Sequence, residues 1–127
     1  MSLKNIAVEG CTLEFQNGGS GTITVTPGQT SMTTKADGKS VYTSLKFTVS
    51  AYTGGEITIP GSGSGSGEIT ASAEKVKVDG KKVFLEGDVS ATFTITGQKP
   101  SGTTTVPATN DEVVKITDAG QSKSKGA

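Results

Sequence analysis

The feature that most constrains this 127-residue chain is the alternation of apolar and polar residues at every second position. The clearest case is SVYTSLKFTVSAYT, residues 40–53, where Val41, Leu45, Phe47 and Ala51 share one face and polar residues share the other. This period is typical of half-buried β-strands, and no segment carries apolar residues at helical spacing. The sequence therefore predicts an all-β fold.

Short glycine-rich runs interrupt the alternation, and glycine supplies the positive φ that tight turns require. The length fits one compact domain, which we expect to cover residues 1–117. The run PGSGSGSG, residues 60–67, is interpreted as a long surface loop, and residues 118–127 as a polar tail without periodicity. The expected strands are residues 6–8, 12–16, 22–26, 40–52, 56–59, 68–78, 82–86, 90–96 and 112–116.

Two Asp-Gly pairs predict two-residue hairpin turns, one at Asp37-Gly38 and one at Asp79-Gly80, because both central positions of a type I′ turn need positive φ. A further turn is predicted at Gly87-Asp88. The segment KADGKSVY, residues 35–42, is identical to KVDGKKVF, residues 77–84, at five positions and has an aromatic residue at the same sixth position. This similarity has two explanations: an internal duplication that gives a pseudo-symmetric fold, or the chance recurrence of a common turn.

The inventory of reactive side chains is poor. The chain has 12 basic and 12 acidic residues and no histidine, so it lacks the basic excess of nucleic-acid-binding proteins. Without histidine, Ser-His-Asp and Cys-His sites are excluded, and the single Cys11 is interpreted as a small buried apolar residue. We expect a protein that is not an enzyme and that uses no cofactor or metal ion. Long apolar runs and a signal peptide are also absent, which argues against stable membrane anchoring.

Residues 75–97, KVKVDGKKVFLEGDVSATFTITG, follow the segment ITASAE, and the chain opens with Gly10, Cys11, Leu13 and Phe15 in a Gly-Cys-x-Leu-x-Phe run. Together these segments resemble the PAAR-like family of spike-tip proteins. The resemblance implies a small pointed β cone, one copy of which caps the trimeric β-helical spike of a contractile phage tail or a related injection system. It also implies a location in such a virion or particle, assembled in the cytoplasm. Zinc-containing members use several His and Cys ligands, so a metal-free apex is expected here.

If the chain caps a spike, apolar strand edges should contact the trimeric spike protein. The candidate interface residues are Val41, Leu45, Phe47, Val83, Leu85, Val113 and Ile116. Two other functions remain open. A tail-tube, baseplate or decoration protein would share the Thr-rich and Gly-rich β composition. A carbohydrate-binding module would need exposed aromatic rings, for which Tyr42 and Tyr52 are the only tyrosines and tryptophan is absent.

Overall fold

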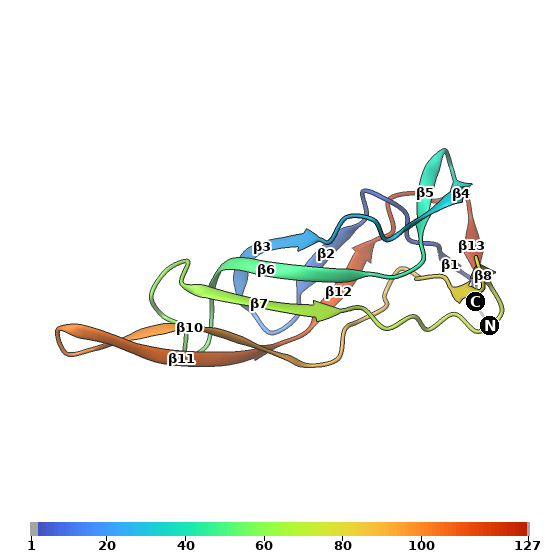
Figure 1. Ribbon diagram of the computed structural model, residues 1–127. Coiled ribbons are helices and arrows are strands. Elements are labelled where there is room, and N and C mark those ends of the chain that lie inside the picture. The colour runs from blue at the N-terminus through green and yellow to red at the C-terminus, as the bar shows by residue number, and fades with distance from the viewer. Residues whose placement is uncertain (1–2, 127) are drawn as a thin grey trace.

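The computed structural model describes residues 3–126, which form strands, turns and loops without a helix (Figure 1). The prediction of an all-β fold is confirmed. The strands are β1 (Lys4–Asn5), β2 (Thr12–Phe15), β3 (Ser20–Val25), β4 (Thr30–Ala36), β5 (Lys39–Tyr42), β6 (Lys46–Thr53), β7 (Gly63–Glu68), β8 (Lys77–Val78), β9 (Lys81–Lys82), β10 (Phe93–Ser101), β11 (Thr104–Glu112), β12 (Val114–Asp118) and β13 (Lys125–Gly126).

A five-stranded antiparallel sheet, in the order β11–β10–β7–β6–β3, forms the main part of the molecule. Strand β6 supplies the buried side chains of Phe47, Val49 and Tyr52. Ala51 has a φ of 52° and lies where the register of β6 shifts. This bulge turns Tyr52 toward the core and exposes Ala51, so the strict alternation predicted across residues 40–53 is wrong at its end.

The hairpin of β10 and β11 extends past the other strands, at the left of Figure 1. It turns at Gly102-Thr103, where Gly102 has a φ of 64°, as a type II′ turn requires. The strand predicted at residues 90–96 covers only the first part of β10, and Glu112 is the one residue of β11 that falls in a predicted strand. Antiparallel pairs alternate between hydrogen-bonded and open positions. Counting from the Ser101–Thr104 pair that closes the turn, Pro100 and Pro107 both fall at open positions, where a missing N–H breaks no bond between the two strands.

The opposite end of the molecule carries both ends of the described chain and three two-stranded sheets, β1–β13, β4–β5 and β8–β9, while the pair β12–β2 lies beside the main sheet in the middle of the molecule (Figure 1). Strands predicted as continuous are divided here. Residues 40–52 break between β5 and β6 at Thr43–Leu45, and residues 68–78 pair only at their two ends and at the bridge from Ile69 to Ser90. The predicted strand at 56–59 is a turn with one bridge, between Gly54 and Ile57.

The predicted surface loop at residues 60–67 is wrong, because the Gly-Ser run forms β7, the central strand of the main sheet. Its serines face solvent while Gly63, Gly65 and Gly67 face inward. A Cβ atom on Gly63 would lie 2.8 Å from Cβ of Tyr52, and one on Gly67 would lie 2.7 Å from Cζ of Phe47. The glycines are therefore required by the aromatic rings that cover this strand.

The predicted polar tail is also wrong. The segment continues β12 to Asp118 and ends in β13, which pairs with β1. Ala119 is fully buried, and its carbonyl accepts a hydrogen bond from the backbone N–H of Val8 at 3.0 Å. Gln121 is also buried and binds the carbonyl of Ile6 at 2.7 Å. Hydrogen bonds rather than apolar periodicity hold this segment, which explains why its composition did not indicate it.

Both Asp-Gly turns are confirmed, and their geometry is the same. Asp37 and Gly38 have φ of 53° and 77°, while Asp79 and Gly80 have φ of 54° and 79°. In each hairpin the residues that flank the turn are paired, Ala36 with Lys39 and Val78 with Lys81.

The two hairpins also occupy matching positions in the core. Val41 and Val83, each three residues after the turn glycine, enter one apolar cluster, while Tyr42 and Phe84 enter another. The chain segment at residues 6–8 lies between them, with a bridge from Val8 to Val41 and one from Ile6 to Leu85. This arrangement is what an internal repeat predicts, since both copies use the same positions for the same kind of contact.

Candidate functional site

The candidate interface residues lie in the protein's own core. Six of them, Val41, Leu45, Phe47, Val83, Leu85 and Ile116, are no more than 3% exposed, and Val113 is partly exposed. They are divided between the two apolar clusters rather than gathered at one edge. The assignment of the six buried residues to a docking surface is therefore wrong. The alternation identified the apolar face of each strand, and that face is covered by other strands of the same chain.

The most connected polar group in the core is the carboxylate of Glu112 at the end of β11, which is fully buried. Its Oε2 accepts a hydrogen bond from the Tyr52 hydroxyl at 2.7 Å. Its Oε1 accepts bonds from the backbone N–H groups of Asn17 at 2.6 Å, Val113 at 3.1 Å and Gln16 at 3.2 Å. The carboxylate thus joins β11, β6 and the turn that links β2 to β3.

Tyr52 is held on all sides at this position. Asn110 Nδ2 donates to its hydroxyl at 2.7 Å, and the ring of Phe15 packs edge to face at 5.1 Å between centroids. A Cβ atom on Gly54 would lie 2.7 Å from the hydroxyl oxygen, so only glycine leaves it enough room. Burial, together with the hydrogen bond to Glu112, raises the pKa of Tyr52 to about 12. The phenol therefore stays protonated and donates to the carboxylate.

The Gly87-Asp88 turn is confirmed, and Asp88 has a structural role in it. Gly87 has a φ of 97°, and the N–H of Asp88 donates to the carbonyl of Leu85 at 3.0 Å. The buried carboxylate of Asp88 accepts bonds from the N–H of Leu85 at 2.9 Å and of Ser72 at 3.2 Å, and also from the Ser72 hydroxyl. Asp88 thus fixes the turn to the preceding extended segment.

Two buried glutamines act in the same way. The side chain of Gln29 donates to the carbonyls of Thr26 and Lys46 and accepts from the N–H of Lys46 at 2.7 Å, so it joins the segment after β3 to the start of β6. Gln121 donates to Ile6 and Ser124 and accepts from the N–H of Lys123 at 2.8 Å. Each glutamine side chain is therefore bonded at both its oxygen and its nitrogen. Gln29 also lines an open hollow of about 310 Å³ together with Pro27 and Tyr42.

Cys11 does not have the surroundings of a reactive thiol. It is partly buried against the larger apolar cluster, and burial raises its pKa to about 11. Because the thiolate is the nucleophilic form, this shift keeps the side chain unreactive near neutral pH. Its environment fits the interpretation of Cys11 as an apolar packing residue.

The surface hollows are open grooves. One of about 300 Å³ lies between β2 and β3, where it is lined by Leu13, Phe15 and Ile23 and has Glu14 as its single ionisable side chain. Across residues 3–126 no three His, Cys, Asp or Glu side chains come close enough to share a metal ion. The same part of the chain contains no helix long and apolar enough to cross a membrane.

Comparison with protein-family models, with curated proteins and with solved structures found no match for this chain.

Proposed function

We propose that this protein is a structural, non-catalytic component of a contractile phage tail or injection particle, and that one copy caps the trimeric spike at its tip. The observation that carries the proposal is the shape of the all-β body. It is elongated and narrows into the β10–β11 hairpin at one end, while both ends of the described chain lie at the broader end (Figure 1). The resemblance of residues 75–97 to PAAR-like spike-tip proteins supports the same function.

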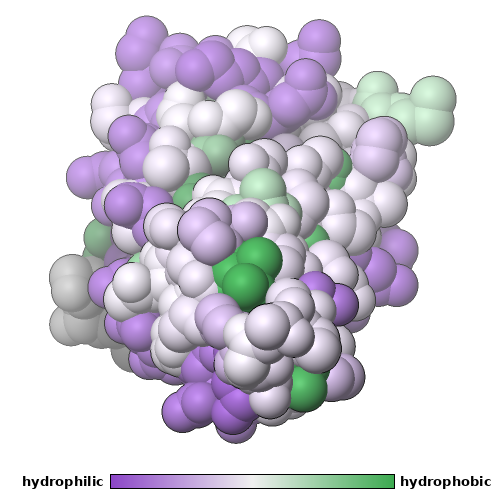
Figure 2. All heavy atoms as spheres, turned by 90° about the vertical axis from the view of Figure 1, so that its left-hand side faces the viewer, coloured by the Kyte–Doolittle hydropathy of each residue, from purple (hydrophilic) through white to green (hydrophobic). Residues whose placement is uncertain are grey.

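The surface of the narrow end is compatible with the free, solvent-exposed end of a spike tip. Viewed along the long axis, this end is covered mostly by side chains of intermediate hydropathy, with only small apolar spots (Figure 2). Thr104, Thr105 and Thr109 of β11 are exposed, and so is Pro107. Threonine is favoured in strands, and an exposed hydroxyl group is hydrated by water without a protein partner.

The open edge of the main sheet also favours a protein that does not repeat by edge-to-edge pairing. Pro107 lies at an open position in the middle of β11, so its missing N–H falls on the free edge of that strand. A tube or ring protein that assembles by adding strands would lack a donor there. The second edge favours the alternative of a tube, baseplate or decoration protein, because within residues 3–126 β3 pairs only with β6, and it borders the open groove beside β2.

A carbohydrate-binding function has less support. Tyr42 is 7% exposed and Tyr52 is fully buried, so neither ring is free to stack on a sugar.

The test is to locate and count the chain in particles purified from cells that produce it. Gold-labelled antibodies should mark the spike end, and quantitative mass spectrometry should give one copy for each three copies of the spike protein. Labelling along the tube or over the capsid, or many copies per particle, would reject the tip function in favour of the tail-structural alternative.

A further inference from the structure

The β8–β9 hairpin places two lysines directly opposite each other. Lys77 of β8 pairs with Lys82 of β9, and both side chains are exposed. Like charges at directly opposed positions destabilise a strand pair, so this arrangement weakens the hairpin in isolation. Within residues 3–126, neither lysine forms an ion pair.

Two lysines elsewhere in the molecule have acidic neighbours. Lys46 of β6 pairs in register with Glu68 of β7. Lys99 of β10 lies 3.5 Å from a carboxylate oxygen of Glu56. The unbalanced pair on β8–β9 is thus a local departure from the charge pattern of the main sheet.

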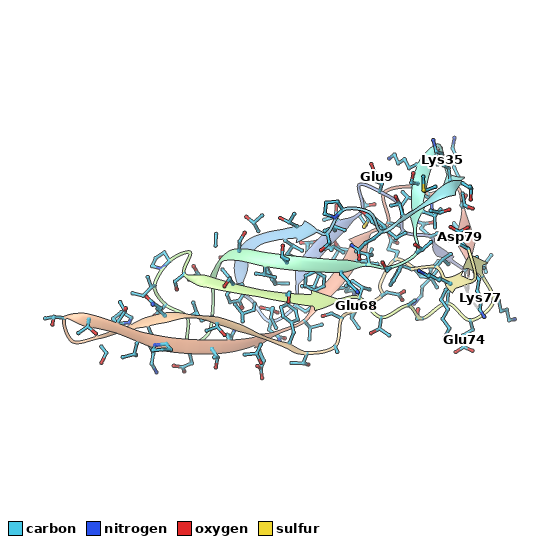
Figure 3. The ribbon with its side chains drawn as sticks, viewed as in Figure 1. Glu9, Lys35, Glu68, Glu74, Lys77 and Asp79 are labelled. Carbon is cyan, nitrogen blue, oxygen red and sulfur yellow. The ribbon has the colours of Figure 1, made fainter. Side chains whose placement is uncertain are left out.

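The hairpin is anchored, so its lysines are presented on a fixed surface. Val76 and Val78 are partly buried against the smaller apolar cluster, and Val83 is fully buried in it. Strand β13 packs alongside, since a Cβ atom on Gly126 would lie 2.9 Å from a methyl carbon of Val76. This contact brings the exposed Lys125 to the same end of the molecule. Figure 3 shows Lys77 at that end with Glu74 and Asp79, away from the β10–β11 hairpin.

We propose that the surface formed by the exposed side chains of Lys75, Lys77 and Lys82, the lysine hairpin, docks on a carboxylate-rich surface of a partner protein. This inference rests on the proposed function, in which it identifies the broad end as the end that meets the spike. Carboxylates placed between Lys77 and Lys82 would convert a repulsive pair into a bridged one. The acidic Glu74 and Asp79 border the lysines and suit a protein surface of mixed charge.

Nucleic acid and anionic membranes fit this surface less well. Each presents a uniform array of phosphates, whereas a protein surface can place carboxylates opposite the lysines and basic groups opposite Glu74 and Asp79. Among residues 3–126 no aromatic side chain is fully exposed, so none is available beside the lysines for stacking on bases.

The test measures binding of a fluorescent oligoglutamate peptide to the isolated protein at low ionic strength. The double variant Lys77→Glu/Lys82→Glu is compared with a control double variant, Lys46→Glu/Lys99→Glu. The control changes the net charge by the same amount, but on the main sheet. We expect the first variant to lose about tenfold or more in affinity, equivalent to about 1.4 kcal/mol, and the control to lose less than about twofold. Thermal unfolding of both variants shows whether each remains folded, and Lys77→Gln with Lys82→Gln gives a milder replacement if the reversal does not fold.

Several results would overturn the docking surface: no binding of oligoglutamate to the natural chain, an equal loss in the control variant, or tighter binding to phosphatidylglycerol vesicles or to a DNA duplex than to the peptide. These measurements use the isolated protein, so they are separate from the particle experiment. Absence of the chain from the spike would reject the proposed function and leave the peptide result unchanged.

Discussion

Single buried polar residues take the place of missing backbone partners in this small fold. Glu112 collects three backbone donors and one hydroxyl, and Gln29 and Gln121 bind backbone groups at the start of β6 and next to β1. The sequence did not indicate these roles, because a glutamate or glutamine in a polar segment is usually exposed. Asp88 was predicted to lie in a turn because it follows a glycine. Its role as a buried hydrogen-bond acceptor was not predicted.

The Tyr52→Phe substitution should lower the free energy of unfolding at pH 7 by about 1–3 kcal/mol, since it leaves a buried acceptor on Glu112 and a donor on Asn110 without a partner. The matched control is Tyr42→Phe, because the Tyr42 hydroxyl forms no hydrogen bond within residues 3–126. Urea denaturation should show a change below about 0.5 kcal/mol for that control. Equal effects of both substitutions would contradict the role assigned to the Glu112 network.

The same two variants should differ from the natural protein at alkaline pH. An unfolded tyrosine loses its proton near pH 10, whereas Tyr52 and Tyr42 in the folded protein keep theirs until about pH 12. The folded state therefore binds more protons between these values, and the free energy of unfolding falls as the pH rises through them. Each Phe variant should show a shallower fall in the free energy of unfolding over this pH range, because it lacks one of the two tyrosines. At neutral pH only Tyr52→Phe should be less stable than the natural protein.

At the level of elements, alternation and turn chemistry predicted the strands whose apolar side chains face the core. Strand β6 and both Asp-Gly turns follow from these local rules. Strand β7 was missed because its inward positions hold glycine, so the period of two is present as Gly and Ser instead of apolar and polar. Strand β11 was missed for a different reason: its Pro107 is tolerated only because it lies on a free edge, which is a property of the assembled sheet.

The Gly63→Ala substitution tests whether residues 60–67 contain a packed central strand or form a flexible loop. The added Cβ would lie 2.9 Å from the carbonyl oxygen of Tyr52, a backbone atom that cannot move without disturbing the strand pair. We expect the free energy of unfolding to fall by about 1–3 kcal/mol. Ser64→Ala, on the exposed face of the same strand, should change it by less than about 0.5 kcal/mol. A stable Gly63→Ala protein would show that β7 does not pack as described.

At the scale of the whole molecule, the chain closes on itself through contacts between its two ends. Strand β1 pairs with β13, and the buried segment from Ile6 to Val8 binds Ala119, Gln121 and Ser124. The sequence could predict an all-β domain but not this closure, because the contacts join positions more than 100 residues apart through backbone groups. Ile6 and Val8 of this segment also belong to the smaller apolar cluster, which holds three of the predicted interface residues: Val41, Val83 and Leu85.

Ending the chain after Asp118 tests this closure. The truncation removes the carbonyl partners of Val8 and Ile6, each bound at 3.0 Å, together with the Gln121 side chain that binds Ile6. At roughly 1 kcal/mol for each hydrogen bond, and with newly exposed apolar surface in addition, we expect a loss of about 3 kcal/mol or more in urea denaturation. The control is Lys123→Ala, whose exposed ion pair with Asp37 should contribute less than about 1 kcal/mol. A truncated protein as stable as the full chain would mean that the residues after Asp118 lie on the surface without stabilising the fold. A loss of stability in the truncated protein but not in Lys123→Ala would show that the C-terminal segment completes the fold.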